Sequence, residues 1–252
     1  MDNKKEDDPD YILNIKDEPE KSDILLMKTF EWVICLVLSI AVALAIRYYI
    51  VTPRIVDQFS MFPTLNTGQH VVVNRLKGVE ELKRGDIIIF QSPSVMYIKD
   101  NVDLLNPVAR YDEQDFSKVE SFKFHVLEIN KNNYVKRIIG IPGDSVKILD
   151  EKVYLNGELL DEPYIPSDIP TTSMSGEFTD IVVPDGHFFV MGDNRVKSTD
   201  SRCFACIPFE KVDGEIFVIT TAVFSFLIFM LIVIILMMLI IPFLIKKRKH
   251  SN

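Results

Sequence analysis

Two short segments carry residues that could do covalent chemistry. Ser60 opens the run Ser60-Met61-Phe62-Pro63-Thr64-Leu65, and Lys136 lies within Tyr134-Val135-Lys136-Arg137-Ile138-Ile139-Gly140. If the second segment is a strand, Lys136 and Arg137 project to opposite faces among apolar neighbours. One face of such a strand is normally buried, and burial lowers the pKa of a lysine. A neutral lysine can take a proton from a serine hydroxyl, which is the Ser–Lys form of nucleophilic catalysis.

Each segment also has an ordinary structural interpretation. A serine shortly before a proline is usually a turn residue, and a lysine in a strand usually faces solvent. No Ser-His-Asp spacing or phosphate-binding glycine loop is visible, and the four histidines are scattered. Cys203 and Cys206 form a lone C-x-x-C, to which a zinc site would have to add two ligands. The sequence therefore predicts neither a metal nor a cofactor, and it leaves a disulfide between these cysteines open.

Charge and hydropathy indicate a membrane protein rather than a nucleic-acid-binding protein. The net charge of −8 disfavours nucleic acid, which would need a basic surface. Two apolar runs, residues 32–51 and 216–245, lie near the two ends of the chain. Arg47 interrupts the first run near its end, where it could reach the interface beside Tyr48 and Tyr49. A cleaved signal peptide is the alternative, but a long acidic segment precedes this run and favours an uncleaved anchor.

Basic residues near the two apolar runs predict the topology. Lys16, Lys21 and Lys28 precede the first run, and four basic residues follow the second, which places both termini in the cytoplasm. The second run is about ten residues longer than the ~20 that cross a bilayer, so residues 214–220 are expected to form a strand. The expected organisation is a disordered tail (1–29), a first span (30–52), an extracytoplasmic domain (53–220), a second span (221–245) and a basic cytoplasmic tail (246–252).

The central domain has the pattern of a mainly β fold. Residues 87–90, 134–139 and 187–191 form apolar runs bounded by turn signals, and Asn156-Gly157 predicts a type I′ hairpin turn. Helical patterns are almost absent, which favours a curled β-sheet or barrel. Residues 92–133 are polar and irregular, so we interpret them as an insertion or cap.

The chain resembles the bacterial type I signal peptidases over nearly its whole length. Five ordered segments are similar to the sequence boxes of that family, and Lys136 stands where the archaeal and endoplasmic-reticulum branch carries histidine. The segments are Ser60-Met61-x-Pro63-Thr64-Leu65, Arg84-Gly85-Asp86-Ile87, Tyr134-Val135-Lys136-Arg137-Ile138-Ile139-Gly140-x-Pro142-Gly143-Asp144, Val153-Tyr154-x-Asn156-Gly157 followed by Asp161-Glu162-Pro163-Tyr164, and Gly192-Asp193-Asn194-Arg195-x-x-Ser198-x-Asp200-Ser201-Arg202.

The resemblance implies a role for each matching residue. Ser60 would attack the scissile carbonyl, with its backbone N–H in the oxyanion hole, and Lys136 would be the general base. Ser198 would hydrogen-bond the lysine amine and hold its rotamer. The supporting residues would be Asp200 and Arg202 as an ion pair, and Arg137 as a structural residue. Four apolar residues would either shape the pockets that accept the Ala-x-Ala ends of signal peptides or simply pack in the core. They are Val56, Met61, Leu65 and Val135.

Three positions depart from the family pattern. Val196 and Lys197 replace polar residues in the last segment, and Phe204-Ala205 stands where Phe-Gly is usual. Gln58 occupies a position that is usually serine or glycine, where the serine contributes to oxyanion binding. Its amide could replace that donor, or it could face solvent.

These observations predict a multi-pass protein of the bacterial cell membrane that removes signal peptides from exported preproteins. Its expected partners are those signal peptides and the lipid bilayer. One alternative is another Ser–Lys peptidase of the same fold, such as a self-cleaving repressor domain, but such domains are soluble and fused to DNA-binding modules. The other alternative is a non-catalytic membrane scaffold derived from a peptidase, which the presence of Ser60, Lys136 and Ser198 disfavours.

Overall fold

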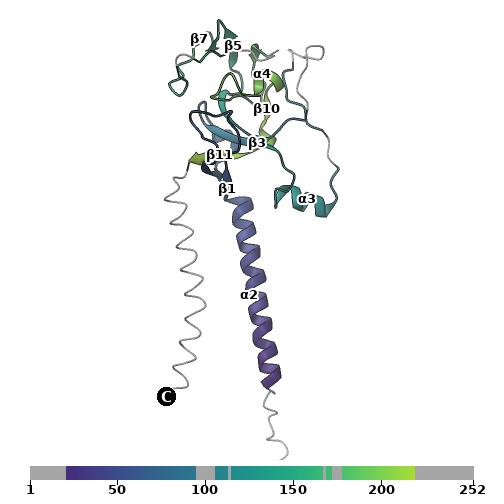
Figure 1. Cartoon of the computed structure of the whole chain (residues 1–252). Coiled ribbons are helices and arrows are strands. Elements are labelled where there is room, and N and C mark those ends of the chain that lie inside the picture. Colours follow the sequence, from purple (N-terminus) through teal and green to yellow (C-terminus); the bar gives the residue numbers. More distant parts are fainter. Residues whose placement is uncertain (1–20, 95–105, 113–114, 167–168, 172–177, 219–252) are drawn as a thin grey trace, which may run out of the picture. The chain divides into compact units, whose positions relative to one another are not determined.

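The computed structural model describes residues 21–94, 106–112, 115–166, 169–171 and 178–218. The chain divides into two compact units, Met1–Ile46 and Arg47–Asn252. The N-terminal unit holds most of helix α2, Lys21–Tyr49 (Figure 1). Within the described residues, one stretch is long and apolar enough to cross a membrane, Leu26–Tyr49. The expected second span and both terminal tails lie largely or wholly outside the described residues.

The first apolar run differs from its expected bounds at both ends. Helix α2 begins at Lys21, within the segment that was expected to be disordered. It ends at Tyr49, and Val51 already belongs to strand β1. The hydropathy of the run therefore located the helix. A polar first turn extends the helix toward the N-terminus, and the β-branched Val51 begins the sheet shortly after it.

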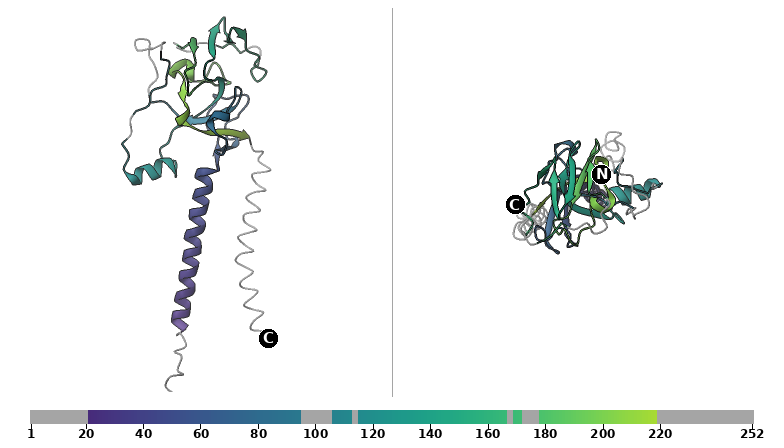
Figure 2. Two further views of the ribbon diagram at one scale, coloured as in Figure 1. Left: turned by 180° about the vertical axis from the view of Figure 1, so that it is seen from behind. Right: turned by 90° about the horizontal axis from the view of Figure 1, so that it is seen from above.

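The second unit is built on a seven-stranded antiparallel sheet that twists and curls (Figure 1, Figure 2). Residues 214–220 were expected to form a strand at the end of the domain. Most of them belong to strand β11, which pairs between β2 and β3 in the interior of the sheet. In sheet order the strands are β1 (Val51–Ile55), β2 (His70–Asn74), β11 (Val212–Val218), β3 (Ile87–Gln91), β4 (Asn133–Gly140), β9 (His187–Met191) and β10 (Ile207–Pro208).

A second, four-stranded antiparallel sheet follows directly from β4. Its order is β7 (Glu158–Leu159), β6 (Lys152–Leu155), β5 (Ser145–Leu149) and β8 (Asp180–Val182). The β6–β7 turn has φ values of 53° at Asn156 and 85° at Gly157, which is the positive-φ pair that a type I′ turn requires. The mainly β prediction is confirmed.

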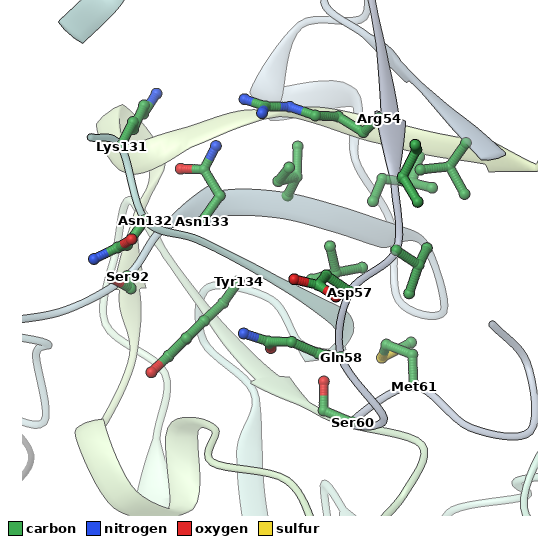
Figure 3. Close-up of a pocket in the computed structure, with 16 residues that line it drawn as sticks. Arg54, Asp57, Gln58, Ser60, Met61, Ser92, Lys131, Asn132, Asn133 and Tyr134 are labelled. Atoms are coloured by element: carbon green, nitrogen blue, oxygen red, sulfur yellow. The ribbon is translucent and has the colours of Figure 1, made fainter. Parts of the chain in front are cut away.

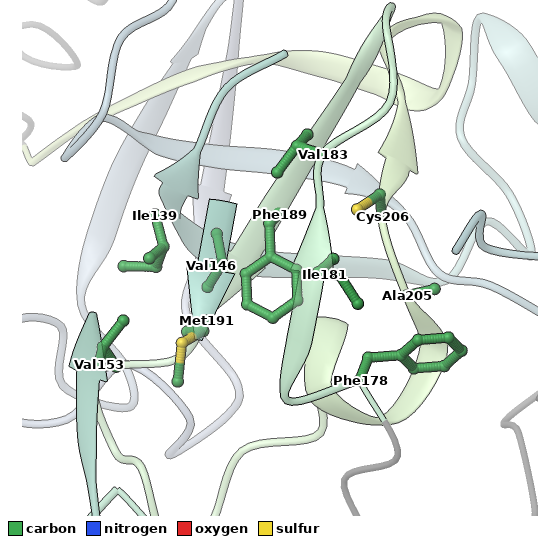
Figure 4. Packing of buried hydrophobic residues seen from close by; sticks show 10 residues of the cluster. All are labelled: Ile139, Val146, Val153, Phe178, Ile181, Val183, Phe189, Met191, Ala205 and Cys206. Carbon is green, nitrogen blue, oxygen red and sulfur yellow. The ribbon is translucent and has the colours of Figure 1, made fainter. Parts of the chain in front are cut away.

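One buried apolar cluster joins the two sheets (Figure 4). Ile139, Phe189 and Met191 reach it from the larger sheet, and Val146, Val153 and Ile181 reach it from the smaller one. Gly140 ends β4 beside this cluster, and a Cβ there would come within 2.8 Å of Val146 and 2.9 Å of Val183. A residue without a side chain is therefore needed where the chain passes from one sheet to the other.

The expectation that residues 92–133 are irregular was wrong in part. Helix α3 spans Lys118–His125, and Ser117 and Glu120 form a capping box at its start. Ahead of it, Ala109 is buried and its N–H donates to the Cys206 carbonyl at 2.8 Å. The described part of the segment thus contains a helix and a stretch packed into the core. The remaining short helices are α4 (Ser201–Phe204), η1 (Val79–Glu81) and η2 (Phe209–Lys211).

Candidate active site

Ser60 and Lys136 are brought together from two different elements. Ser60 lies in the loop after β1, and Lys136 lies in the middle of β4. Lys136 Nζ is 2.7 Å from Ser60 Oγ. Both residues are buried, with exposed fractions of 7 % for Ser60 and 1 % for Lys136. The serine hydroxyl therefore meets the amine in a place from which bulk water is largely excluded.

The loop that carries Ser60 is fastened to the segment after β9. The Asn194 N–H donates to the Ser60 carbonyl at 3.0 Å, and Asn194 Nδ2 donates to the Phe59 carbonyl at 3.1 Å. Gly192 lies against the same carbonyl, because a Cβ there would come within 2.5 Å of Ser60 O and 2.1 Å of Ser198 Oγ. The backbone around Ser60 is thus held by direct bonds and by a close approach that only glycine allows.

Burial lowers the pKa of Lys136 from 10.5 to about 8. The carboxylates of Asp200 and Asp193 act against this shift, and the guanidinium of Arg202 adds to it. Besides Ser60, the amine donates to the Val135 carbonyl at 3.1 Å. With a pKa of about 8, roughly a tenth of the molecules carry a neutral lysine at pH 7. This lysine can therefore accept a proton at ordinary pH, which a solvated one scarcely does.

Arg137 projects from the other face of β4 and connects three segments. Its guanidinium forms a two-point ion pair with Asp193, with Nε–Oδ1 at 2.9 Å and Nη2–Oδ2 at 2.6 Å. It also donates to the Gly85 carbonyl at 2.8 Å and lies 3.8 Å from the centre of the Tyr164 ring. Thr64, in the loop that carries Ser60, donates to Asp193 at 2.5 Å. Arg137 therefore ties the Ser60 loop to the strand that carries Lys136.

Two buried ion pairs support the segment after β9. Arg202 binds Asp200 through Nε at 2.8 Å and Nη2 at 2.7 Å, and the Gly192 N–H adds a bond to Asp200 at 3.0 Å. Burial raises the pKa of Asp200, but the interactions with Arg202, Gly192 and Ser198 outweigh this effect and hold that pKa below its usual value. Arg195, fully buried, pairs with Glu162. Asp193, Arg195 and Glu162 were not predicted as site residues, although an unpaired buried charge is costly and a buried arginine therefore indicates a nearby carboxylate.

Ser198 does not make the expected bond to the lysine amine. Its side chain is buried at 1 % exposure, and its hydroxyl lies near enough to the Asp200 carboxylate to help lower the pKa of that carboxyl. Within the described residues, however, the hydroxyl makes no bond of full hydrogen-bond geometry. Lys136 bonds Ser60 and the Val135 carbonyl instead. Ser198 is still part of the site through its contact with Gly192.

Ser60 lies at the edge of two cavities. The first, of about 410 Å³, is lined by Val56, Met61 and Val135 among others, and the exposed Gln58 side chain extends into it toward Tyr134 (Figure 3). The second, of about 400 Å³, is lined by Ser60, Lys136 and the exposed Lys197. An extended peptide could thus lie on both sides of the serine.

Not all of the expected pocket residues reach the cavity. Leu65 is completely buried in a core cluster with Val71 and Val73 and does not line the first cavity. Asn133, which had not been singled out, lines that cavity and carries a buried amide with no partner within the described residues. The departures at Val196 and Lys197 are exposed side chains, so they alter the surface of the loop rather than its buried bonds.

The cysteines and the other possible metal ligands form no centre of their own. Cys203 and Cys206 are buried free thiols, so the disulfide that the sequence left open is not formed. Burial raises the pKa of the Cys206 thiol. Among the described residues, no group of three His, Cys, Asp or Glu side chains is placed to hold a metal ion.

Comparison with known proteins places these residues in a family. The family described as "Signal peptidase, peptidase S26" matches residues 29–221. Signal peptidase I of Bacillus licheniformis is 33 % identical over 189 residues, covering 73 % of this chain and 83 % of the relative. Signal peptidase I T of Bacillus subtilis strain 168 is 34 % identical over 178 residues, covering 68 % and 74 %.

A solved structure, that of a signal peptidase I from Enterococcus faecalis V583, is 28 % identical. The match covers 55 % of this chain and 97 % of the Enterococcus chain, with a TM-score of 0.34. The family match extends over far more than half of the chain and includes both Ser60 and Lys136. The chain belongs to the S26 family of signal peptidases.

Proposed function

We propose that this chain removes signal peptides from exported preproteins, with Ser60 as the nucleophile and Lys136 as the general base. The chain is a peptidase by family. The assignment of the two residues is carried by one observation: a buried amine with a pKa of about 8 lies 2.7 Å from a buried serine hydroxyl. Nucleophile and base within hydrogen-bond reach are what acyl transfer requires.

The reaction proceeds through an ester on Ser60. As Oγ attacks the scissile carbonyl carbon, its proton passes to the neutral Lys136 amine. The Ser60 N–H and the Gln58 amide hold the tetrahedral oxyanion. The Gln58 side chain extends into the first cavity, beside Ser60. Lys136 then protonates the departing amine of the mature protein. A water molecule gives a proton to Lys136 as it attacks the ester carbonyl. Lys136 returns that proton to Ser60 Oγ as the ester bond breaks, and the signal peptide leaves with a new carboxylate.

The first cavity accepts the residues that precede the cleaved bond. Its apolar wall beside Ser60 consists of Val56, Met61 and Val135, and it suits the small side chains at the Ala-x-Ala ends of signal peptides. Ser198, Asp200, Arg202 and Arg137 position the reacting groups rather than touching the substrate. Ser198 in particular provides an acceptor for the lysine amine once Ser60 has been acylated and no longer accepts from it.

Membrane anchoring supplies orientation. Helix α2 anchors the chain, and a second span within residues 221–245 returns it to the cytoplasm, so that both ends are cytoplasmic and the β domain is outside. A signal peptide is apolar and membrane-bound up to the cleavage site. Confining enzyme and substrate to one interface makes their encounter effectively intramolecular.

Two experiments test these proposals. The purified full chain should cleave a labelled preprotein at its signal peptide, and a Ser60→Ala variant should not. Cleavage by the variant would remove Ser60 from the mechanism. For the topology, protease added outside spheroplasts should digest the domain and spare tags at either end, whereas digestion of a C-terminal tag would disprove the second span.

A further inference from the structure

Three arginines converge on one carboxylate outside the active site. Glu128 Oε2 accepts from Arg54 Nη2 at 2.5 Å and from Arg47 Nη2 at 3.4 Å, and Oε1 accepts from Arg75 Nη2 at 2.6 Å. The Glu128 side chain is 3 % exposed. We call these four residues the arginine cluster.

The cluster carries an excess of positive charge and unused donors. In the ion pairs among described residues, no carboxylate other than Glu128 pairs with Arg47, Arg54 or Arg75, so three cations face one anion. Two of the charges are balanced only by solvent, to which the three side chains are 41 %, 29 % and 14 % exposed. The Nε atoms of all three are buried and have no hydrogen-bond partner within the described residues. Buried donors without partners are costly, and a second anion beside Glu128 would relieve both deficits.

The position of Arg47 indicates where that anion would come from. Arg47 lies in the last turn of the apolar helix α2, and it is followed by the exposed side chains of Tyr49 and Ile50. Ile129, next to Glu128, is also exposed. In a spanning helix, a terminal arginine beside an aromatic residue lies at the level of the lipid headgroups. Phosphate diesters are concentrated there, and the planar guanidinium fork matches phosphate oxygens.

We propose that the arginine cluster binds the phosphate of an anionic phospholipid. The inference rests on the proposed anchoring by α2, but not on the assignment of Ser60 and Lys136. Glu128 holds the three guanidinium groups together and also competes with the ligand for them. Arg54 lines the first cavity as well (Figure 3), so the lipid site and the substrate cavity share a residue.

Thermal unfolding of the full chain in a neutral detergent tests the proposal. Dioctanoyl-phosphatidylglycerol is titrated, with dioctanoyl-phosphatidylcholine and inorganic phosphate as separate arms. A ligand that binds the folded state raises the melting temperature in a saturable manner, which yields an apparent Kd. We expect phosphatidylglycerol to raise the melting temperature. Phosphatidylcholine and inorganic phosphate should raise the melting temperature only weakly at the same concentration.

Variants separate a binding site from a structural ion pair. Arg75→Gln and Arg47→Gln should each weaken the apparent affinity on the order of tenfold. Lys147→Gln, which removes an exposed cation paired with Asp180 on the smaller sheet, should leave it unchanged. Glu128→Gln should tighten binding, since it removes the competing carboxylate. That gain is measured against the variant's own melting temperature, so a general loss of stability does not obscure it.

Three results would overturn the proposal. Equal lipid shifts in the wild type and both arginine variants would place the lipid elsewhere. An equal shift with inorganic phosphate would indicate a site for a soluble anion. No lipid-dependent rise in the melting temperature of the wild type would make the cluster an ion pair only. Preprotein cleavage in lipid-free detergent is followed in parallel, so failure of lipid binding with intact cleavage refutes this inference and leaves the catalytic proposal standing.

Discussion

Lys136 Nζ lies 2.7 Å from Ser60 Oγ, and the two side chains come from positions 76 residues apart. The contact depends on β4 directing Lys136 to one face and Arg137 to the other. On the second face Arg137 binds Asp193, to which Thr64 of the Ser60 loop also donates. The alternation of a single strand thus supplies both the amine and the bond that holds the serine loop against it.

The two reacting residues should behave as one unit. Ser60→Ala and Lys136→Ala should each abolish preprotein cleavage, and the double variant should be no worse than either, because removing one partner already disables the other. Lys136→Arg should be equally inactive, since a guanidinium keeps its proton. Steady-state cleavage rates measure these effects. Appreciable turnover by Lys136→Arg would show that another group is the base.

Gln58→Ala tests the second oxyanion donor. If the amide holds the oxyanion, kcat should fall by about 10²–10³ with KM little changed, and Gln58→Ser should restore much of the loss. Asn132→Ala is a suitable control, because Asn132 is exposed and lines the same cavity beyond Tyr134. A wild-type kcat in Gln58→Ala would leave the Ser60 N–H as the sole donor.

Ser198 and Ser201 provide a matched pair of buried hydroxyls. Ser201 Oγ accepts from the Val190 N–H at 2.9 Å, whereas the Ser198 hydroxyl lies near Asp200 but makes no bond of full hydrogen-bond geometry within the described residues. Ser201→Ala should therefore cost about 1–3 kcal/mol, and Ser198→Ala should lower the melting temperature by less than Ser201→Ala does.

Ser198→Ala should nevertheless reduce kcat more than it changes KM, because the lysine amine loses its acceptor in the acylated enzyme. The pH dependence of kcat should shift as well, which a merely structural role would not produce. An unchanged kcat and pH profile would exclude Ser198 as a positioning residue.

Ala205 has a backbone conformation that glycine normally occupies. Its φ is 71° and its ψ is −161°, a region that costs a residue with a side chain about 1–3 kcal/mol. Ala205→Gly relieves that strain but loses a buried methyl group (about 0.8 kcal/mol) and adds chain entropy (about 0.5–1 kcal/mol). The variant should be about as stable as the wild type.

Ala109→Gly is the control for this prediction. Ala109 is also buried, but its φ is not positive, so the same substitution there has only costs, about 1–2 kcal/mol in sum. Chemical unfolding of both variants compares them. Equal losses at the two positions would show that Ala205 is unstrained.

Local patterns predicted the strands well. The apolar run at 187–191 is β9 with the expected bounds, and the Asn156-Gly157 turn joins β6 to β7 as expected. These elements follow from period, β-branching and turn residues, which are local properties. Helix α3 was missed because its sequence has no clear apolar face, although the Ser117–Glu120 capping box was a usable signal.

Longer-range features could not be predicted in this way. Leu65 lies in the core rather than in the cavity because its N–H bonds the Met61 carbonyl in a tight turn. The pairing of Arg137 with Asp193 spans 56 positions, and no local pattern indicates it. The strain at Ala205 likewise follows from tertiary packing, since the substitution of alanine for glycine looked minor in the sequence.

The pH dependence of kcat/KM tests the central assignment most directly. The full chain in detergent cleaves a peptide that spans the cleavage site, from about pH 6 to about pH 10.5. Only neutral Lys136 is a base, and its pKa is lowered to about 8. We therefore expect kcat/KM to rise about tenfold per pH unit below that value and to be level above it. A profile with no inflection, or one that rises only near the ~10.4 of a solvated lysine, would contradict it.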